Sequence, residues 1–229
     1  MSRRRKLEKF ADLLRYQNVY EMTQPGSPLL RRDTDTMIDL RGKWKNQVFE
    51  SDFPLCLELA CGRGEYSVGL ARIFPEKNFI GVDIKGARIH KGATIALQDK
   101  LSNVCFLRTR IEQINLYFDI GEVDEIWITF PDPFPSKENR RLTSKIFLDK
   151  YLQLLRPQAK VHLKTDDDDL FEFSMTSIKE HPSYEIREEC KNISELRESR
   201  PELNILTYYE KEHLLNKKTI KYLQLEKID

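Results

Sequence analysis

Short apolar runs alternate with segments of helical spacing through most of this 229-residue chain. The apolar runs predict buried strands at residues 55–61, 78–84, 104–109, 123–130 and 160–165. The helical spacing predicts helices at residues 64–74, 87–101, 144–155 and 169–180. Strands that alternate with helices in this way favour a doubly wound α/β fold with a mostly parallel sheet. Residues 184–190 and 219–227 have no obvious helix between them and are predicted to pair as an antiparallel edge.

Composition excludes several classes of protein. Lys and Arg number 38 against 37 Asp and Glu, a formal net charge of +1, so a nucleic-acid surface requires local clustering of cations. The 4 cysteines have no CxxC spacing and are predicted to be buried, reduced thiols rather than metal ligands. No apolar stretch follows the charged start or reaches the length of a membrane span. We therefore expect a cytoplasmic protein without metal and without membrane contact.

The first fifty residues differ from the rest. They are polar and basic with weak periodicity, and the stretch TQPGSP interrupts them at residues 23–28. Length alone favours one domain or at most two. We therefore divide the chain into a basic, partly ordered N-terminal extension, residues 1–50, and an α/β domain, residues 51–229.

Ligands in a sheet of this kind bind beyond the carboxyl ends of the strands, so the residues that follow each strand are candidate site residues. Gly62 and Gly64 follow the first strand and let the backbone approach a ligand closely, although any tight strand-to-helix turn favours glycine. Asp83 ends the second strand, where its carboxylate can accept hydrogen bonds from ribose hydroxyls or cap the next helix. The two features together favour a nucleoside-containing cofactor.

The side chains around this turn favour S-adenosylmethionine over NAD. A dinucleotide site normally has a third glycine and seats a pyrophosphate, but Ser67 occupies the third position and Glu65 would repel phosphate. S-adenosylmethionine carries an ammonium and a sulfonium and no phosphate. Glu58, which precedes the turn, suits that charge.

The fourth predicted strand ends in FPDPFP, which places Asp132 between two prolines. The fixed φ angles of proline limit the freedom of this loop, although PDP is also good turn chemistry in which the aspartate needs no further role. Lys137, Arg140 and Arg141 follow closely and are predicted to contact phosphates. Asp167, Asp168 and Asp169 are predicted to cap and begin the helix after the fifth strand.

These motifs together resemble the bacterial tRNA (guanine-N7)-methyltransferase family. The resemblance covers about residues 50 to 225 and rests on ELACGRGEY, FIGVDI, FPDP with RRL, KTDD and TYYEK, in that order. FPDP and the distal TxYE are its most specific elements, because generic methyltransferases lack them. It implies a Rossmann-like class I methyltransferase domain over residues 51–229, with S-adenosylmethionine as cofactor and tRNA as partner, in a monomer or homodimer. The implied reaction is methylation of guanine N7 at position 46 of the variable loop.

The resemblance also implies a role for each motif residue. It assigns to the cofactor Glu58, Gly62, Gly64, Asp83, Arg110 and Asp132, and it makes Asp132 the catalytic residue. It assigns to the tRNA Ser136, Lys137, Arg140, Arg141, Asp166, Thr207, Tyr209 and Glu210. The basic start, residues 3–6, is expected to be a disordered arm that docks on RNA phosphates.

The chain departs from the family pattern at several positions. Ala60 stands at the usual first glycine, which a slightly wider turn would absorb. Arg110 replaces an acid or amide and cannot accept a hydrogen bond from adenine, so a backbone carbonyl or Glu112 would take that contact. Phe134 replaces a tryptophan and keeps an apolar surface. The basic stretch is about two residues shorter, Ser136 falls where lysine is common, and Lys137 is expected to take that role.

The chemistry of guanine N7 is consistent with this set of residues. N7 already has an in-plane lone pair, so methylation removes no proton from it and needs no strong general base. The protein has to hold N7 in line with the methyl group and stabilise positive charge that develops on the purine. Asp132 can do both if it accepts hydrogen bonds from guanine N1–H and N2–H₂.

Three alternatives remain open from the sequence. One is a class I methyltransferase that acts on another RNA or on a small molecule, against which TYYE and RRL argue. Another is a non-catalytic tRNA-binding partner, which would be expected to have lost Asp132 or Glu58. The third is an NAD-dependent dehydrogenase, which Ser67 and Glu65 disfavour.

Overall fold

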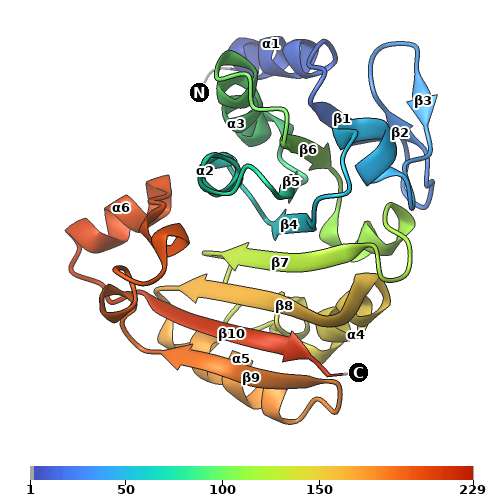
Figure 1. Cartoon of the computed structure of the whole chain (residues 1–229). Coiled ribbons are helices and arrows are strands. Elements are labelled where there is room, and N and C mark those ends of the chain that lie inside the picture. The colour runs from blue at the N-terminus through green and yellow to red at the C-terminus, as the bar shows by residue number, and fades with distance from the viewer. Residues whose placement is uncertain (1–2, 229) are drawn as a thin grey trace.

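A computed structural model describes residues 3–228, and these residues form one sheet of ten strands with helices on both faces (Figure 1). The strands are β1 (Val19–Met22), β2 (Leu30–Arg31), β3 (Met37–Ile38), β4 (Leu55–Leu59), β5 (Asn78–Asp83), β6 (Val104–Arg108), β7 (Val123–Thr129), β8 (Leu155–Thr165), β9 (Tyr184–Cys190) and β10 (Lys221–Lys227). The α-helices are α1 (Arg3–Leu13), α2 (Glu65–Ile73), α3 (Gly86–Gln98), α4 (Lys145–Leu154), α5 (Asp168–Lys179) and α6 (Tyr208–Leu215). Short 3₁₀ or π turns are η1 (Lys45–Phe49), η2 (Ile111–Leu116), η3 (Glu138–Arg140), η4 (Ile193–Glu195) and η5 (Pro201–Asn204).

The strand order places a topological switch at the middle of the sheet. The order is β3-β2-β1-β6-β5-β4-β7-β8-β10-β9, so the chain winds from β4 towards β6 and then returns to β7 on the other side of β4. The strands from β1 to β8 in this order pair in parallel. The carboxyl ends of β4 and β7 therefore diverge into connections on opposite faces, which opens a crevice between them.

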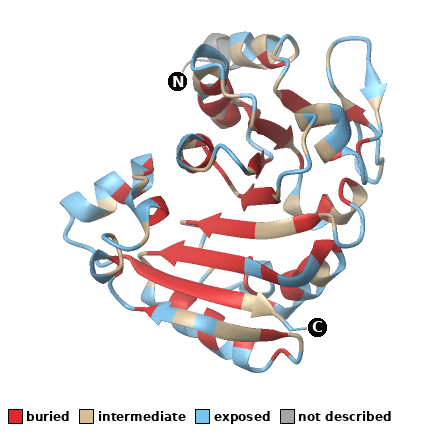
Figure 2. Ribbon diagram, viewed as in Figure 1, coloured by how far each residue is buried: buried red, intermediate tan, exposed pale blue. Residues whose placement is uncertain are grey.

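Alternation along the strands builds a core on each face of the sheet. Leu57 of β4 and Ile126 of β7 belong to one apolar cluster, with side chains of α4 and α5. Cys56 and Trp127, their chain neighbours, belong to the other, with side chains of α2 and α3. Figure 2 shows the central strands buried along most of their length, as expected when helices cover both faces of a parallel sheet.

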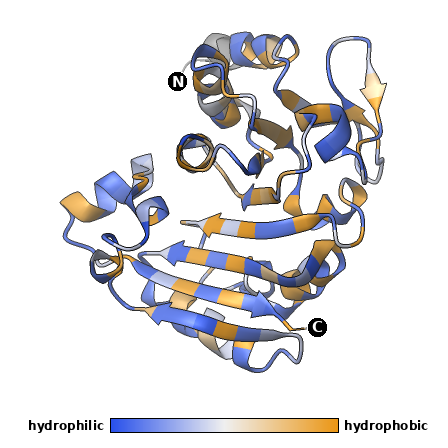
Figure 3. Cartoon of the chain, in the orientation of Figure 1, coloured by the Kyte–Doolittle hydropathy of each residue, from blue (hydrophilic) through white to orange (hydrophobic). Residues whose placement is uncertain are grey.

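The predicted fold class is confirmed, with one difference in the edge. β9 and β10 pair antiparallel as expected, but β10 lies between β8 and β9 and is antiparallel to both. β9 forms the outer edge, and Figure 3 shows it coloured mostly as hydrophilic. Charged side chains on an edge strand disfavour pairing with a second chain. β8 starts at Leu155, earlier than predicted, because Leu155 already pairs with Val123 of β7. The exposed residues 156–158 form an irregularity in this pairing, where Gln158 has a φ angle of 61°.

The first fifty residues contribute to the same sheet. β1 pairs in parallel with β6, and β2 and β3 extend that edge antiparallel. α1 packs against α3 at the top of Figure 1. The backbone is helical from Arg3, so the expected disordered arm is wrong for residues 3–6. The division at residue 50 stays a prediction, and the sheet runs across it.

Trp44 ties this segment to the rest of the core. Its side chain is fully buried, and its Nε1 donates a hydrogen bond of 2.8 Å to the carbonyl oxygen of Tyr117. Its ring stacks on Phe118, with the two centroids 5.4 Å apart.

Among the described residues, the helices are too short or too polar to span a membrane.

Trp44→Ala is expected to lower the free energy of unfolding by about 3–5 kcal/mol, because it leaves a large cavity in the core and removes a buried hydrogen bond. Urea denaturation monitored by circular dichroism measures the change. Phe53→Ala, at a ring that is 45% exposed, is the control and should change the free energy far less. A Trp44 variant whose main transition matches the wild type would show that residues 1–50 do not share the core.

Candidate active site

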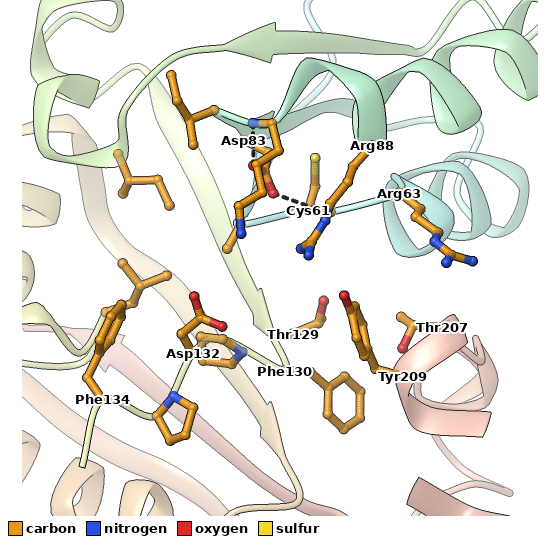
Figure 4. Close-up of a pocket in the computed structure, with 18 of the residues that line it drawn as sticks. Cys61, Arg63, Asp83, Arg88, Thr129, Phe130, Asp132, Phe134, Thr207 and Tyr209 are labelled. Carbon is orange, nitrogen blue, oxygen red and sulfur yellow. Dashed lines mark hydrogen bonds between the residues drawn. The ribbon is translucent and has the colours of Figure 1, made fainter. Parts of the chain in front are cut away.

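A cavity of about 820 Å³ lies at the carboxyl ends of β4, β5, β6, β7 and β8 (Figure 4). Its wall combines the turn after β4, the FPDPFP loop after β7, the end of β8 and the start of α6. In Figure 1, α6 stands beyond the arrowheads of β7 and β8, which explains how it reaches the same cavity. Of the predicted site residues, the cavity is lined by Gly62, Asp83, Arg110, Asp132, Arg140, Asp166, Thr207 and Tyr209.

The turn after β4 uses three left-handed residues to reverse the backbone. Ala60, Gly62 and Gly64 have φ angles of 58°, 55° and 68°. Ala60 thus has a left-handed conformation that glycine adopts without strain and that costs about 1–2 kcal/mol for a residue with a Cβ. The wider turn stays a prediction. A Cβ on Gly62 would meet only the carbonyl oxygen of Ala60, at 3.9 Å, so the backbone there is open to a ligand.

Gly64 has a packing role. A Cβ built on Gly64 would lie 2.4 Å from Phe106 Cε1 and 3.2 Å from the Cα of Gly92 on α3. Gly64 is absent from the residues of the described chain that line the cavity, so its assignment to the cofactor stays a prediction. The observed reason for glycine is the close approach of α2 to α3 and β6.

Asp83 holds the turn in place and faces the cavity. One carboxylate oxygen accepts a hydrogen bond of 2.9 Å from the Gly62 amide, and the other accepts one of 2.7 Å from the Lys85 amide. Lys85, not Asp83, is the residue that precedes α3. A carboxylate oxygen has a second lone pair, so both oxygens can still accept a hydrogen bond from a ligand.

Glu58 lies behind the turn, outside the cavity lining. Its carboxylate accepts hydrogen bonds from the Ser67 amide at 2.8 Å, from the Ser67 hydroxyl, and from the Thr129 hydroxyl at 2.7 Å. It therefore satisfies a free amide in the first turn of α2 and joins β4 to β7. Burial raises the pKa of the Glu58 carboxyl to about 7, although the three hydrogen bonds favour the charged form. Direct contact with a cofactor stays a prediction, and the observed contacts are structural.

The FPDPFP loop is bent at both ends. Phe130 and Phe134 have φ angles of 49° and 42°, unusual for bulky residues. The Phe130 amide donates to the carbonyl oxygen of Lys164 on β8 at 2.8 Å, which fixes the first bend to the sheet. Between the bends Asp132 is exposed, and Figure 4 shows its carboxylate pointing into the cavity. Among the residues whose side chains are described, 7–228, it has no hydrogen-bond or ion-pair partner, so both oxygens are available to a ligand.

The cations after the loop have different environments. Arg141 is 4% exposed, and its Nε donates a hydrogen bond of 2.8 Å to the carbonyl oxygen of Pro133. Its guanidinium also lies over the Phe173 ring, 4.4 Å from the centroid. Arg141 therefore holds the FPDPFP loop, and its buried guanidinium is not accessible for the predicted phosphate contact. Arg140 lines the cavity, whereas Ser136 and Lys137 are exposed outside it.

Asp166 lines the cavity as part of a charged cluster. Its carboxylate pairs with Lys218 and lies 3.3 Å from His213 Nδ1. Asp167 accepts a hydrogen bond of 2.7 Å from the Leu170 amide, which confirms the predicted helix cap. The described residues contain no group of three or more His, Cys, Asp or Glu that could hold a metal ion.

The TYYE segment begins α6 and divides into open and buried residues. Thr207 caps the helix by accepting from the Glu210 amide at 3.1 Å, and Tyr209 is 37% exposed beside the cavity. Glu210 is fully buried: one oxygen lies 3.0 Å from Lys164 Nζ and the other 3.1 Å from an Arg197 nitrogen. Because these ion pairs enclose it, the Glu210 carboxylate is not accessible for the predicted contact to tRNA.

Four cations of the cavity wall were not predicted from the sequence: Arg63, Lys85, Arg88 and Lys218. Arg63 and Arg88 line the cavity from the turn after β4 and from α3. Arg63 lies between the two glycines of the motif ELACGRGEY, and the sequence gives it no role of its own. Arg88 is five residues beyond Asp83, in the first turn of α3, where the sequence gives no sign that distinguishes it from an ordinary exposed helix residue.

Comparisons with known proteins agree on the kind of protein. Residues 52–223 match the family model described as "Putative methyltransferase". A tRNA (guanine-N(7)-)-methyltransferase of Bacteroides thetaiotaomicron is 45% identical over 96% of this chain and 84% of its own. One of Christiangramia forsetii is 40% identical over 99% of each chain. Among solved structures, the 16S rRNA methyltransferase KamB superposes with a TM-score of 0.63 at 13% identity, over 85% of this chain and 97% of its own, which shows the fold.

Glu58 is expected to make stability depend on pH. Its pKa rises from 4.5 in the unfolded chain to about 7 in the folded one, so the folded state binds the proton more tightly. The wild type should therefore lose up to about 3 kcal/mol of stability, relative to Glu58→Gln, as pH rises from about 4.5 to 7, with no further loss above that. Urea titrations of both proteins at several pH values measure the difference. A constant difference across this range would contradict the raised pKa.

Glu210→Gln is expected to lower the free energy of unfolding by about 3–5 kcal/mol, because it leaves the buried Lys164 ammonium without its counter-charge. Glu212→Gln, on the exposed face of the same helix, is the matched control and should change it by about 0.5 kcal/mol or less. Lys164→Met combined with Glu210→Gln should restore part of the loss, since no unpaired ammonium remains. Equal effects of the two single Glu variants would rule out a buried pair.

Proposed function

The chain belongs to the family of tRNA (guanine-N7)-methyltransferases, and on that basis we propose that it transfers a methyl group from S-adenosylmethionine to N7 of guanosine 46 in the variable loop of tRNA. The observation that carries the proposal is the unpartnered carboxylate of Asp132, which faces the cavity at the switch point of the sheet. Because the substrate is tRNA, we propose that the protein is located in the cytoplasm. We also propose that it is a monomer or a homodimer.

The residues around the first turn fit the cofactor. S-adenosylmethionine supplies an electrophilic methyl group on a sulfonium. The backbone at Gly62 leaves room for close approach, and Asp83 keeps acceptor capacity towards ribose hydroxyls. Arg110 and Glu112 line the cavity at the end of β6, so Glu112 is available for the adenine amino group that Arg110 cannot serve. Glu58 and Gly64 support this turn from behind.

Asp132 binds and orients the guanine. Its carboxylate accepts from N1–H and N2–H₂ of the base, which directs the opposite N7 edge towards the methyl donor. Its negative charge offsets the positive charge that the purine gains as the methyl group is transferred. The two flanking left-handed bends and the Arg141 contact to Pro133 hold the carboxylate in place before the base arrives.

The remaining predicted residues divide by exposure. Arg140, Lys137 and Ser136 are accessible and are proposed to contact tRNA phosphates or riboses near the loop. Asp166, Thr207 and Tyr209 line the cavity and are proposed to contact the target nucleotide. Arg141 and Glu210 have a positioning role. Arg141 holds the FPDPFP loop through its contact with Pro133, and Glu210 holds α6 through its ion pair with Lys164.

A methyl-transfer assay on unmodified tRNA tests the function. Labelled S-adenosylmethionine and nucleoside analysis should yield 7-methylguanosine, and replacing guanosine 46 by adenosine should abolish it. Another methylated nucleoside would favour a methyltransferase of a different site or RNA. Binding of tRNA without transfer would favour a non-catalytic partner.

Asp132→Asn should slow methyl transfer by about a hundredfold, on the order of 3 kcal/mol in the barrier. The amide is nearly isosteric, but it presents an NH₂ donor and lacks the charge that the transition state needs. Affinity for tRNA should change less, because phosphate contacts provide most of it. Single-turnover kinetics with saturating tRNA and cofactor isolates the transfer step. A near wild-type rate would rule out this role of Asp132, and FPDP would then be only a turn that ends a strand.

A further inference from the structure

Cations without a carboxylate partner gather at the cavity. Arg63 and Arg88 both line it and are only partly exposed, yet neither forms an ion pair within the part of the chain that the structure describes. By contrast, Arg72 on α2 pairs with Asp99, and Lys91 on α3 pairs with Glu65. In a chain whose formal net charge is only +1, unpaired guanidinium groups in a cavity indicate an anionic ligand.

Both guanidinium groups are positioned by α6. The Arg63 Cζ lies 3.8 Å from the centroid of the Tyr208 ring, and the Arg88 Cζ lies 6.0 Å from that of Tyr209. Stacking on an aromatic face restrains a guanidinium without using its N–H donors, which stay free for oxygen atoms of a ligand. The Tyr208 amide donates a hydrogen bond of 2.7 Å to a carboxylate oxygen of Glu65, which fixes α6 beside these arginines.

The pair faces a different part of the cavity from the FPDPFP loop. In Figure 4, Arg63 and Arg88 reach from the same side of the cavity as Cys61 and Asp83 towards Thr207 and Tyr209, away from Asp132. Tyr208 and Tyr209 are 38% and 37% exposed, so this corner opens to solvent where an extended polyanion can reach it. The accessible Arg140 lies over the ring of Phe134, which Figure 4 shows on the other side of the Asp132 carboxylate.

We propose that Arg63 and Arg88 form a second anion site, which binds a backbone phosphate of the tRNA close to the target guanosine. The inference rests on the proposed function, because it takes tRNA as the substrate. Phosphate contacts on two sides of Asp132 would fix the nucleotide at both ends, and a base that must leave its stack needs such anchoring to reach the carboxylate. The guanidinium fork suits a phosphate, since it can donate two parallel hydrogen bonds.

The test compares Arg63→Gln, Arg88→Gln and the double variant with Arg72→Gln, which removes an arginine from α2 outside the cavity. Binding of unmodified tRNA is measured across salt concentrations, and thermal melting checks that each variant is folded. The double variant should bind on the order of tenfold more weakly near physiological salt, and its salt slope should fall by about one unit. Arg72→Gln should match the wild type in both.

Calorimetry with S-adenosylhomocysteine separates the two sources of an oxyanion, the RNA phosphate and the amino-acid carboxylate of the cofactor. We expect its affinity to change less than twofold in the double variant. A large loss of S-adenosylhomocysteine binding with an unchanged tRNA salt slope would overturn the proposal and assign the arginines to the cofactor. Unchanged values in both assays would overturn it as well. The proposed function fails separately, if wild-type protein does not methylate tRNA.

Discussion

The buried ion pair between Lys164 and Glu210 is the contact on which the site depends. It joins β8 at the middle of the sheet to α6 near the end of the chain, and both side chains are fully buried. Burial lowers the pKa of Lys164 from its ordinary value, and the charge of Glu210 opposes that shift. The carbonyl oxygen of Lys164 also accepts a hydrogen bond from the Phe130 amide. One residue therefore fixes the FPDPFP loop through its backbone and α6 through its side chain.

Backbone conformations that are rare for these residue types cluster around the cavity. Ala60, Phe130 and Phe134 all have positive φ, and all lie at the ends of β4 and β7, the two strands that flank the switch point. Such conformations persist only where surrounding contacts over-determine them. Here the contacts are the Asp83 hydrogen bond across the first turn and the Arg141 hydrogen bond to Pro133 across the second. The strained residues present Gly62 and Asp132 to the same space from opposite sides.

The sequence predicted the central sheet well, because buried parallel strands give continuous apolar runs that are hard to mistake. It missed β1 to β3, because strands of two to four residues contain too few positions for a period to emerge. The cofactor turn and Asp132 were identified, since motif order and strand ends specify them. The resemblance assigns Arg141 and Glu210 to tRNA because they lie in its motifs RRL and TYYEK. Only tertiary packing reveals that Pro133 and Lys164 are their partners.

Two acids at neighbouring strand ends illustrate how position decides role. Glu58 on β4 is surrounded by three donors behind the turn, where burial favours its neutral form and its contacts connect β4, α2 and β7. Asp132, just beyond β7, is exposed to the cavity and has its hydrogen-bonding capacity unused among the described residues. Transfer to guanine N7 needs a fixed negative charge rather than a base that exchanges a proton. An accessible carboxylate on a restrained loop meets that need, and a buried one whose pKa lies near 7 does not. The chain therefore uses its buried acid to shape the site, and we assign its accessible acid to the substrate.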